Sequence, residues 1–166
     1  MTRKLIFIRH ARAEDQVQGM SDFERSLTKK GKRHSKLLAR IMKSKDNDPG
    51  VIVSSPAFRA LETALIFCRE YGISTDTVMI RPELYSDLNK EDYMSLITSS
   101  AGNATTLTFF GHNPLITEMA SCFAAEDPGG LPKTGIICLS FEAESWSEIE
   151  PQSGITEYFL SPKTSL

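Results

Sequence analysis

Two histidines and two arginines stand out because of where they fall in the chain. Each lies shortly after an apolar run that predicts a strand: Arg9 and His10 after residues 5–8, Arg59 after 51–53, and His112 after 105–110. An imidazole can act as a nucleophile, and a guanidinium group makes forked, charge-assisted hydrogen bonds to phosphate oxygens. These residue types together indicate phosphate binding and phosphoryl transfer through a histidine.

A metal site is the alternative that two histidines raise, because imidazole is a common metal ligand. The sequence holds no His-x-x-x-His and no His-Glu-x-x-His motif. Arginines beside the histidines would also repel a cation. The sequence therefore predicts no metal and no other cofactor.

Apolar runs and helical periodicity alternate along the chain. Strands are expected at 4–8, 51–53, 78–80, 105–110, 135–141 and 155–160, and helices at 28–44, 55–71, 89–99 and 113–123. This order predicts a three-layer α/β/α fold with a mostly parallel central sheet and an antiparallel edge formed by the last two strands. The carboxyl ends of parallel strands share one rim, so the histidines and arginines are expected to meet there.

Two helices are expected to begin at a polar cap followed by a proline, at Ser55-Pro56 and Asn113-Pro114. In the first of them the apolar spacing predicts a core-facing stripe, namely Phe58, Leu61, Leu65 and Cys68. Arg59 lies off this stripe in the first helical turn, where the helix dipole disfavours a cation. An anion near Arg59 would explain that placement, and so would a surface salt bridge.

The bulk properties describe a soluble globular protein. The 166 residues suit a single domain spanning 1–166, and the net charge of −2 disfavours nucleic acid and anionic membrane as partners. Three widely spaced cysteines indicate a reducing compartment, and neither a signal peptide nor a membrane span is visible. We expect a cytoplasmic protein, and a monomer because the edge strands are polar.

Four motifs in order resemble the histidine phosphatase superfamily (phosphoglycerate mutase-like), over about residues 4–162. They are Arg9-His10-Ala11, Arg25-Ser26-Leu27-Thr28 with Gly31, Ser54-Ser55-Pro56 with Arg59-Ala60 and Thr63-Ala64, and Gly111-His112-Asn113-Pro114. The short chain and the region of Trp146 look most similar to the SixA-type phosphohistidine phosphatase branch. The resemblance implies the same α/β/α fold.

The resemblance also implies a role for each matching residue. His10 would be the nucleophile that becomes phosphorylated, and Arg9 and Arg59 would hold the phosphate oxygens. His112 would donate a hydrogen bond to the same oxygens. Arg25 falls where the SixA-like branch places a further phosphate-facing arginine, although a surface loop residue is the alternative interpretation.

One departure concerns the general acid. Many superfamily phosphatases carry a glutamate after the third strand that protonates the leaving oxygen, whereas here no acid aligns cleanly and Glu83 and Asp87 are the candidates. Imidazole leaves more readily than an alcohol, because it is a weak base with a pKa of about 6.5. The sequence therefore favours substrates with good leaving groups, above all phosphohistidine.

Three functions remain open at this point. The first is a metal-independent phosphatase that acts on phosphohistidine proteins through a phosphohistidine at His10. The second is a phosphatase of a small phosphorylated metabolite. The third is a non-catalytic module that binds phosphate-bearing partners, although binding alone would require neither histidine.

Overall fold

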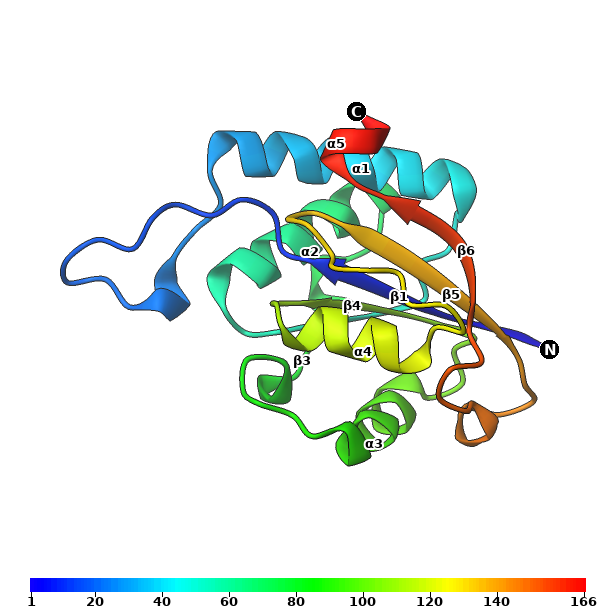
Figure 1. Ribbon diagram of the computed structural model, residues 1–166. Helices are drawn as coiled ribbons and strands as arrows, with labels where there is room; N and C mark the ends of the chain where they lie inside the picture. The colour runs from blue at the N-terminus through cyan, green and yellow to red at the C-terminus, as the bar shows by residue number, and fades with distance from the viewer.

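The protein is built around one six-stranded sheet, described in a computed structural model that covers residues 1–166. The strand order is β3-β2-β4-β1-β5-β6. Figure 1 shows helices on both faces of this sheet. The strands are β1 (Thr2–Arg9), β2 (Val51–Ser54), β3 (Met79–Ile80), β4 (Thr106–Gly111), β5 (Ile136–Glu142) and β6 (Ile155–Leu160).

The sheet is mostly parallel with an antiparallel edge, as the sequence predicted. Strand β4 pairs in parallel with β1 and with β2, and β2 pairs in parallel with β3. Strand β5 runs antiparallel to β1, and β6 runs antiparallel to β5. The carboxyl ends of the first four strands therefore lie along one rim of the sheet.

The helices form two layers, one on each face of the sheet (Figure 1). Helices α1 and α2 cover one face, and α3 and α4 cover the other. Their bounds are α1 (Lys29–Lys45), α2 (Phe58–Tyr71), α3 (Lys90–Ala101), α4 (Leu115–Phe123) and the short α5 (Pro162–Ser165). No helix is both long and apolar enough to cross a membrane.

The buried strand β1 joins the two cores because its side chains alternate between the faces. Leu5 and Phe7 pack in the core beneath α3 and α4, whereas Ile6 and Ile8 pack beneath α1 and α2. All four side chains are fully buried. A strand buried on both faces has to be apolar throughout, which explains the continuous apolar run at this position.

Two helix starts differ from the prediction. Helix α2 begins at Phe58 rather than at Pro56, and α4 begins at Leu115 after the cis peptide Asn113-Pro114. The Ser55 hydroxyl does accept from the Ala57 backbone N–H at 3.3 Å, but it lies too early in the chain to cap α2. The extra residues form sharp turns between each strand and its helix.

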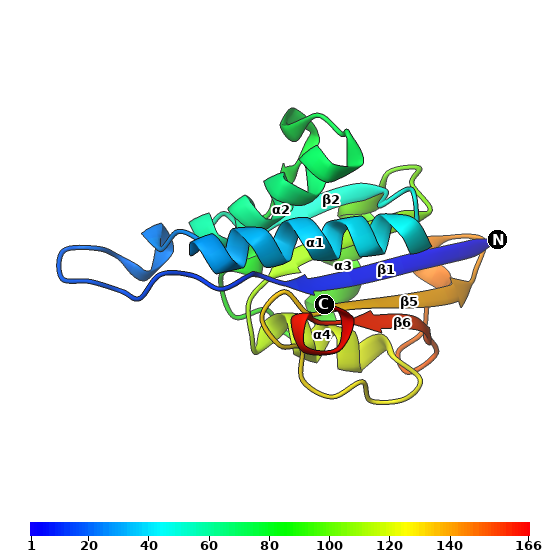
Figure 2. The ribbon, with the colours of Figure 1, turned by 90° about the horizontal axis from the view of Figure 1, so that it is seen from above.

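The connection between β1 and α1 forms an arm, residues 11–28, that projects beyond the rim (Figure 2). Its base is a bridge between Ala13 and Leu27, and both residues are buried. The Thr28 hydroxyl caps α1 by accepting from the Gly31 N–H at 2.9 Å, as expected from the sequence. Where the arm returns from its tip toward α1 it carries the 3-10 helix η1 (Asp22–Glu24), which lies against α2.

Candidate active site

Strand register brings the two histidines together. Arg9 at the end of β1 pairs with Gly111 at the end of β4, so the next residue on each strand is a histidine at the same level. The His10 backbone N–H donates to the Gly111 carbonyl at 3.0 Å, which extends the pairing by one residue. The ring centroids of His10 and His112 consequently lie 5.1 Å apart.

The His10 imidazole is held in one tautomer. Its Nδ1 lies 2.7 Å from the Ala11 carbonyl oxygen, and a carbonyl can only accept, so Nδ1 carries the hydrogen. The Nε2 atom then keeps its lone pair. The pKa of His10 is lowered to about 3, mainly by burial and further by the charges of His112, Arg59 and Arg9. The hydrogen bond to Ala11 acts in the opposite direction and raises the pKa. A neutral imidazole with a free Nε2 lone pair is suited to nucleophilic attack.

The second imidazole is fixed by Ser55, which the sequence suggested as a helix cap and as part of a family motif but not as a contact of His112. The Nε2 atom of His112 lies 2.8 Å from the Ser55 Oγ. Burial, and then the charge of Arg59, lower the pKa of His112 to about 4, while Asp22 acts to raise it. The Nδ1 atom of His112 is buried without a hydrogen-bond partner.

The two arginines also present unpaired donors. Arg9 donates from one terminal nitrogen to the Leu131 carbonyl at 3.2 Å, and its Nε is buried and unpartnered. Arg59 is 6% exposed, and its Nε is likewise buried and unpartnered. A buried donor left unpaired costs about 1–3 kcal/mol, so these atoms fit a site that receives an anion such as phosphate.

The burial of Arg59 corrects the predicted stripe on α2. Phe58 is 44% exposed, because its ring packs edge-on against Phe23 at the rim rather than in the core. The buried face is shifted around the helix and includes Arg59, Ala60, Thr63, Ala64, Phe67, Cys68 and Tyr71. The small residues on this face let the helix lie close to its neighbours, with the Arg59 guanidinium turned to the rim.

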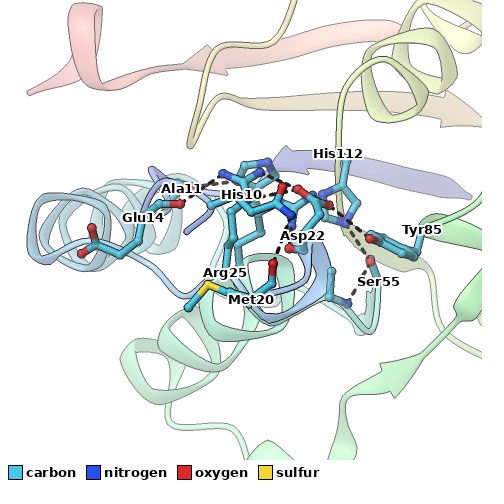
Figure 3. A network of polar contacts seen from close by, with 12 residues as sticks. His10, Ala11, Glu14, Met20, Asp22, Arg25, Ser55, Tyr85 and His112 are labelled. Atoms are coloured by element: carbon cyan, nitrogen blue, oxygen red, sulfur yellow. Dashed lines mark hydrogen bonds and ion pairs between the residues drawn. The ribbon is translucent and has the colours of Figure 1, made fainter. Parts of the chain in front are cut away.

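The residue that the sequence analysis missed is Asp22, in η1. Its Oδ2 accepts from Arg59 at 2.9 Å and from the Tyr85 hydroxyl at 3.1 Å, and its Oδ1 accepts from Arg25 Nε at 3.0 Å. Figure 3 shows the carboxylate between Arg25 and Tyr85. Burial would raise the pKa of Asp22, but the hydrogen bond and charge of Arg59, with hydrogen bonds from Tyr85 and Arg25, lower it.

Arg25 therefore reaches the site through Asp22. Besides its contacts with that carboxylate, it donates to the Glu14 carbonyl at 3.2 Å. The spacing of Asp22 and Arg25, three residues apart beside the motif that includes Arg25, is the signal that could have drawn attention to Asp22.

A cleft of about 570 Å³ opens beside His112. Its walls come from η1, the start of α2, the connection after η3 (Pro82–Leu84) and the start of α4, and they include Asp22, Arg59, Tyr85 and His112. Of the two candidate acids, Asp87 lines this cleft, whereas Glu83 lines a separate hollow against α3. His10 does not line the cleft.

Similarity to known proteins agrees with this arrangement. The family described as histidine phosphatase superfamily (branch 1) matches residues 5–85, a span that includes His10, Asp22, Arg25 and Arg59. Over this span, which is just under half of the chain, the sequence is similar to the histidine phosphatase superfamily. No curated protein sequence matches it significantly.

Several solved structures share the fold over nearly the whole chain. SixA from Agrobacterium tumefaciens is 25% identical, with a TM-score of 0.78 over 96% of this chain and 98% of that chain. The protein histidine phosphatase SixA complexed with tungstate is 19% identical, with a TM-score of 0.80 over 96% and 97%. A mycobacterial glucosyl-3-phosphoglycerate phosphatase is 16% identical, with a TM-score of 0.63 over 91% and 96%.

Proposed function

We propose that this protein is a metal-independent phosphatase that forms a phosphohistidine on His10 and acts on phosphohistidine-bearing proteins. The observation that carries the proposal is the neutral, tautomer-fixed imidazole of His10, which lies beside His112, the buried Arg59 and the half-buried Arg9. The match to the histidine phosphatase superfamily over residues 5–85 supports phosphatase activity. The roles of the individual residues and the substrate class are our inference.

In the first step the Nε2 lone pair of His10 attacks phosphorus. A bond forms between Nε2 and phosphorus while the bond from phosphorus to the leaving group breaks, and the leaving group takes the electron pair. Arg9 and Arg59 stabilise the charge on the transferring oxygens, and His112 donates a hydrogen bond to one of them. The Ala11 carbonyl stabilises the positive charge that develops on the imidazole through the Nδ1 hydrogen bond.

In the second step water hydrolyses the phosphohistidine. A water oxygen bonds to phosphorus, the bond between phosphorus and Nε2 breaks, and His10 regains its lone pair as orthophosphate leaves. One water proton stays on the orthophosphate, and the other passes to the solvent and replaces the proton that the leaving group took up. The net reaction consumes one water and yields the dephosphorylated group and orthophosphate. No residue changes its protonation state over the complete cycle.

The charge around the cleft favours an imidazole-bearing substrate over an anionic metabolite. Asp87 and Glu118 line the cleft beside the phosphate donors. These carboxylates would repel a metabolite that carries a second anionic group, whereas an imidazole leaving group carries none. The similar structure of SixA in complex with tungstate is that of a protein histidine phosphatase, which is consistent with a phosphohistidine protein as the substrate.

A small phosphorylated metabolite is the second candidate. The structural similarity to a mycobacterial glucosyl-3-phosphoglycerate phosphatase shows that this fold also serves a metabolite substrate. A metabolite substrate for this chain would have to tolerate the two cleft carboxylates. The phosphate ester of an uncharged sugar meets that condition better than the phosphate ester of a carboxylic acid, which carries a second anionic group.

The test compares wild type with His10→Ala on p-nitrophenyl phosphate and on a phosphohistidine protein, with EDTA present. We expect the wild type to hydrolyse both, EDTA to have no effect, and the variant to lose at least about a thousandfold in kcat because the nucleophile is gone. Alkaline quenching should trap a phosphoenzyme on wild type only, and brief acid treatment should release its phosphate. Activity that survives in His10→Ala, or that needs a divalent metal, would refute the mechanism.

A further inference from the structure

The Asp22 carboxylate takes up donors that a phosphoryl group would use. Its two oxygens accept hydrogen bonds from Arg59, Arg25 and Tyr85 (Figure 3). A carboxylate and a phosphoryl group offer the same feature to a guanidinium fork, namely two anionic oxygens at similar spacing. Arg59 cannot give the same nitrogens to both, so the two anions compete for it.

Burial explains why Arg59 needs an anionic partner. The Arg59 side chain is 7% exposed, whereas the Asp22 side chain is 44% exposed. A guanidinium group this buried is destabilising without a counter-charge, but a carboxylate at the surface can exchange its partner for water at little cost. The carboxylate is therefore the member of the pair that is free to leave.

The segment that carries Asp22 is attached to the rim as a unit. The Asp22 carbonyl accepts from Arg59 at 2.8 Å, and the Phe23 ring packs against Phe58 and Tyr85 at centroid distances of 5.7 and 5.3 Å. Between this segment and the paired base of the arm, the chain is exposed over residues 14–19. The backbone carbonyl of Asp22 and the Phe23 ring therefore hold η1 at the rim, and the Asp22 carboxylate is the part that can exchange its partner.

The limited access to His10 also indicates that the Asp22 carboxylate has to move away from Arg59. His10 is 7% exposed and does not line the cleft, whereas Asp22 and Arg59 do. A phosphorus atom must approach Nε2 to within about 3 Å for attack. Entry of the phosphoryl group from the cleft therefore requires the wall formed by Asp22 and Arg59 to rearrange.

We propose that Asp22 is an internal competitor of phosphate, which the phosphoryl group of the substrate displaces from Arg59 and Arg25. The carboxylate returns to the arginines as orthophosphate leaves, so it weakens product binding and favours turnover. This inference rests on the proposed function, since it assumes that these arginines hold the phosphoryl group.

The test measures orthophosphate binding by isothermal titration calorimetry, without catalysis. Asp22→Asn keeps the shape of the side chain and the backbone carbonyl but removes the competing charge. We expect its Kd for orthophosphate to fall about fivefold, the effect of losing a partly exposed ion pair. Its KM for p-nitrophenyl phosphate should fall as well, and inhibition by orthophosphate should strengthen.

Two further variants keep the test decisive. Glu24→Gln removes one negative charge from an exposed position of the same 3-10 helix and should leave the Kd unchanged. Tyr85→Phe removes the hydroxyl that donates to Asp22 and should lower the Kd by about twofold without a change in charge. Tyr85→Phe also carries the test should Asp22→Asn fail to fold.

The outcomes separate this inference from the proposed function. If wild type hydrolyses p-nitrophenyl phosphate but Asp22→Asn binds orthophosphate no more tightly, the competitor role is refuted and the phosphatase stands. Weaker binding by Asp22→Asn, with Glu24→Gln unchanged, would mean that Asp22 positions Arg59 for phosphate instead. If wild type neither hydrolyses the ester nor binds orthophosphate, both proposals fall.

Discussion

At the scale of single residues, the site depends on what surrounds each imidazole. The Ala11 carbonyl fixes the hydrogen of His10 on Nδ1, and Ser55 fixes His112 through Nε2. Burial and nearby positive charge keep both rings neutral, with pKa values of about 3 and 4. A histidine of ordinary pKa would be partly protonated at neutral pH and would lack the lone pair that attack requires.

The low pKa of His10 predicts the pH dependence of activity. Because the ring loses its proton well below pH 6, kcat/KM for p-nitrophenyl phosphate should show no acid limb with an apparent pKa near 6.5. Steady-state kinetics between about pH 5.5 and 8 checks this expectation. A protonation step near pH 6.5 that disappears in His34→Ala would be assigned to the surface, whereas one that persists would contradict a neutral, buried His10.

The same pKa predicts a pH dependence of stability. The pKa of about 3 in the folded protein lies below the ordinary histidine value of 6.5. The unfolded chain therefore binds more protons between these limits, and the free energy of unfolding rises with pH there. The stabilisation is complete above pH 6.5 and is lost as the pH falls toward 3. Urea titrations at about pH 7 and 5.5 should show a decrease in stability that is about 1 kcal/mol smaller in His10→Ala. An identical decrease in both proteins would contradict the assignment.

At the scale of elements, the arm 11–28 decides whether the site is complete. It carries Asp22 and Arg25 and is held by contacts at its base. The α1 helix approaches the arm so closely at Gly31 that a Cβ there would lie 2.2 Å from the Arg12 carbonyl oxygen. Glycine is required at this position by the close approach, although helices generally disfavour it.

Gly31→Ala should therefore destabilise the protein. The steric overlap with Arg12 costs about 2–3 kcal/mol, which outweighs the gain of about 1 kcal/mol in helix propensity, so a net loss of about 1–2 kcal/mol is expected. Chemical denaturation measures this loss. Gly130→Ala is the matched control, because a Cβ at that position meets nothing within 4 Å. Equal stability of the two variants would show that the backbone at Arg12 can shift to make room for the Cβ without a loss of free energy of unfolding.

At the scale of the whole molecule, the sheet places His10, which we propose as the nucleophile, together with the arginines and the cleft on one rim. The two candidate general acids differ in their location. Asp87 lines the cleft, whereas Glu83 lies in a separate hollow against α3. Asp87 is exposed and accepts none of the hydrogen bonds that hold the site together. The molecule thus offers little help to a leaving group that needs a proton.

The lack of a well-placed general acid should determine which substrates the protein prefers. We expect kcat/KM to fall steeply as the leaving-group pKa rises, with p-nitrophenyl phosphate at least about a hundredfold better than glycerol 2-phosphate, the size of a missing general acid. Phosphohistidine protein should rank with the good leaving groups. A series of aryl and alkyl phosphates under identical conditions measures the slope. Equal rates for aryl and alkyl esters would overturn this expectation and direct attention to Asp87→Asn.

Much of the fold could be predicted from the sequence. The run Leu5–Ile8 predicted a strand buried on both faces, and the alternation of strands and helices predicted the mostly parallel sheet with its antiparallel edge. These features follow from local apolar patterns, which report directly on burial. The same logic predicted that His10 and His112 would meet, because parallel strands end at a common rim.

Other features were decided by contacts between segments distant in the sequence. Ser55 bonds to His112 across 57 positions, and Arg59 bonds to Asp22 across 37. No local periodicity encodes such pairs, so Asp22 went unnoticed. The predicted apolar stripe of α2 was correct at Cys68 but was displaced around the helix from the buried face. The sequence by itself determined the sheet and the residue types at its rim. Only the tertiary structure decided which side chains hold the imidazoles and arginines, because that depends on how separate elements pack in space.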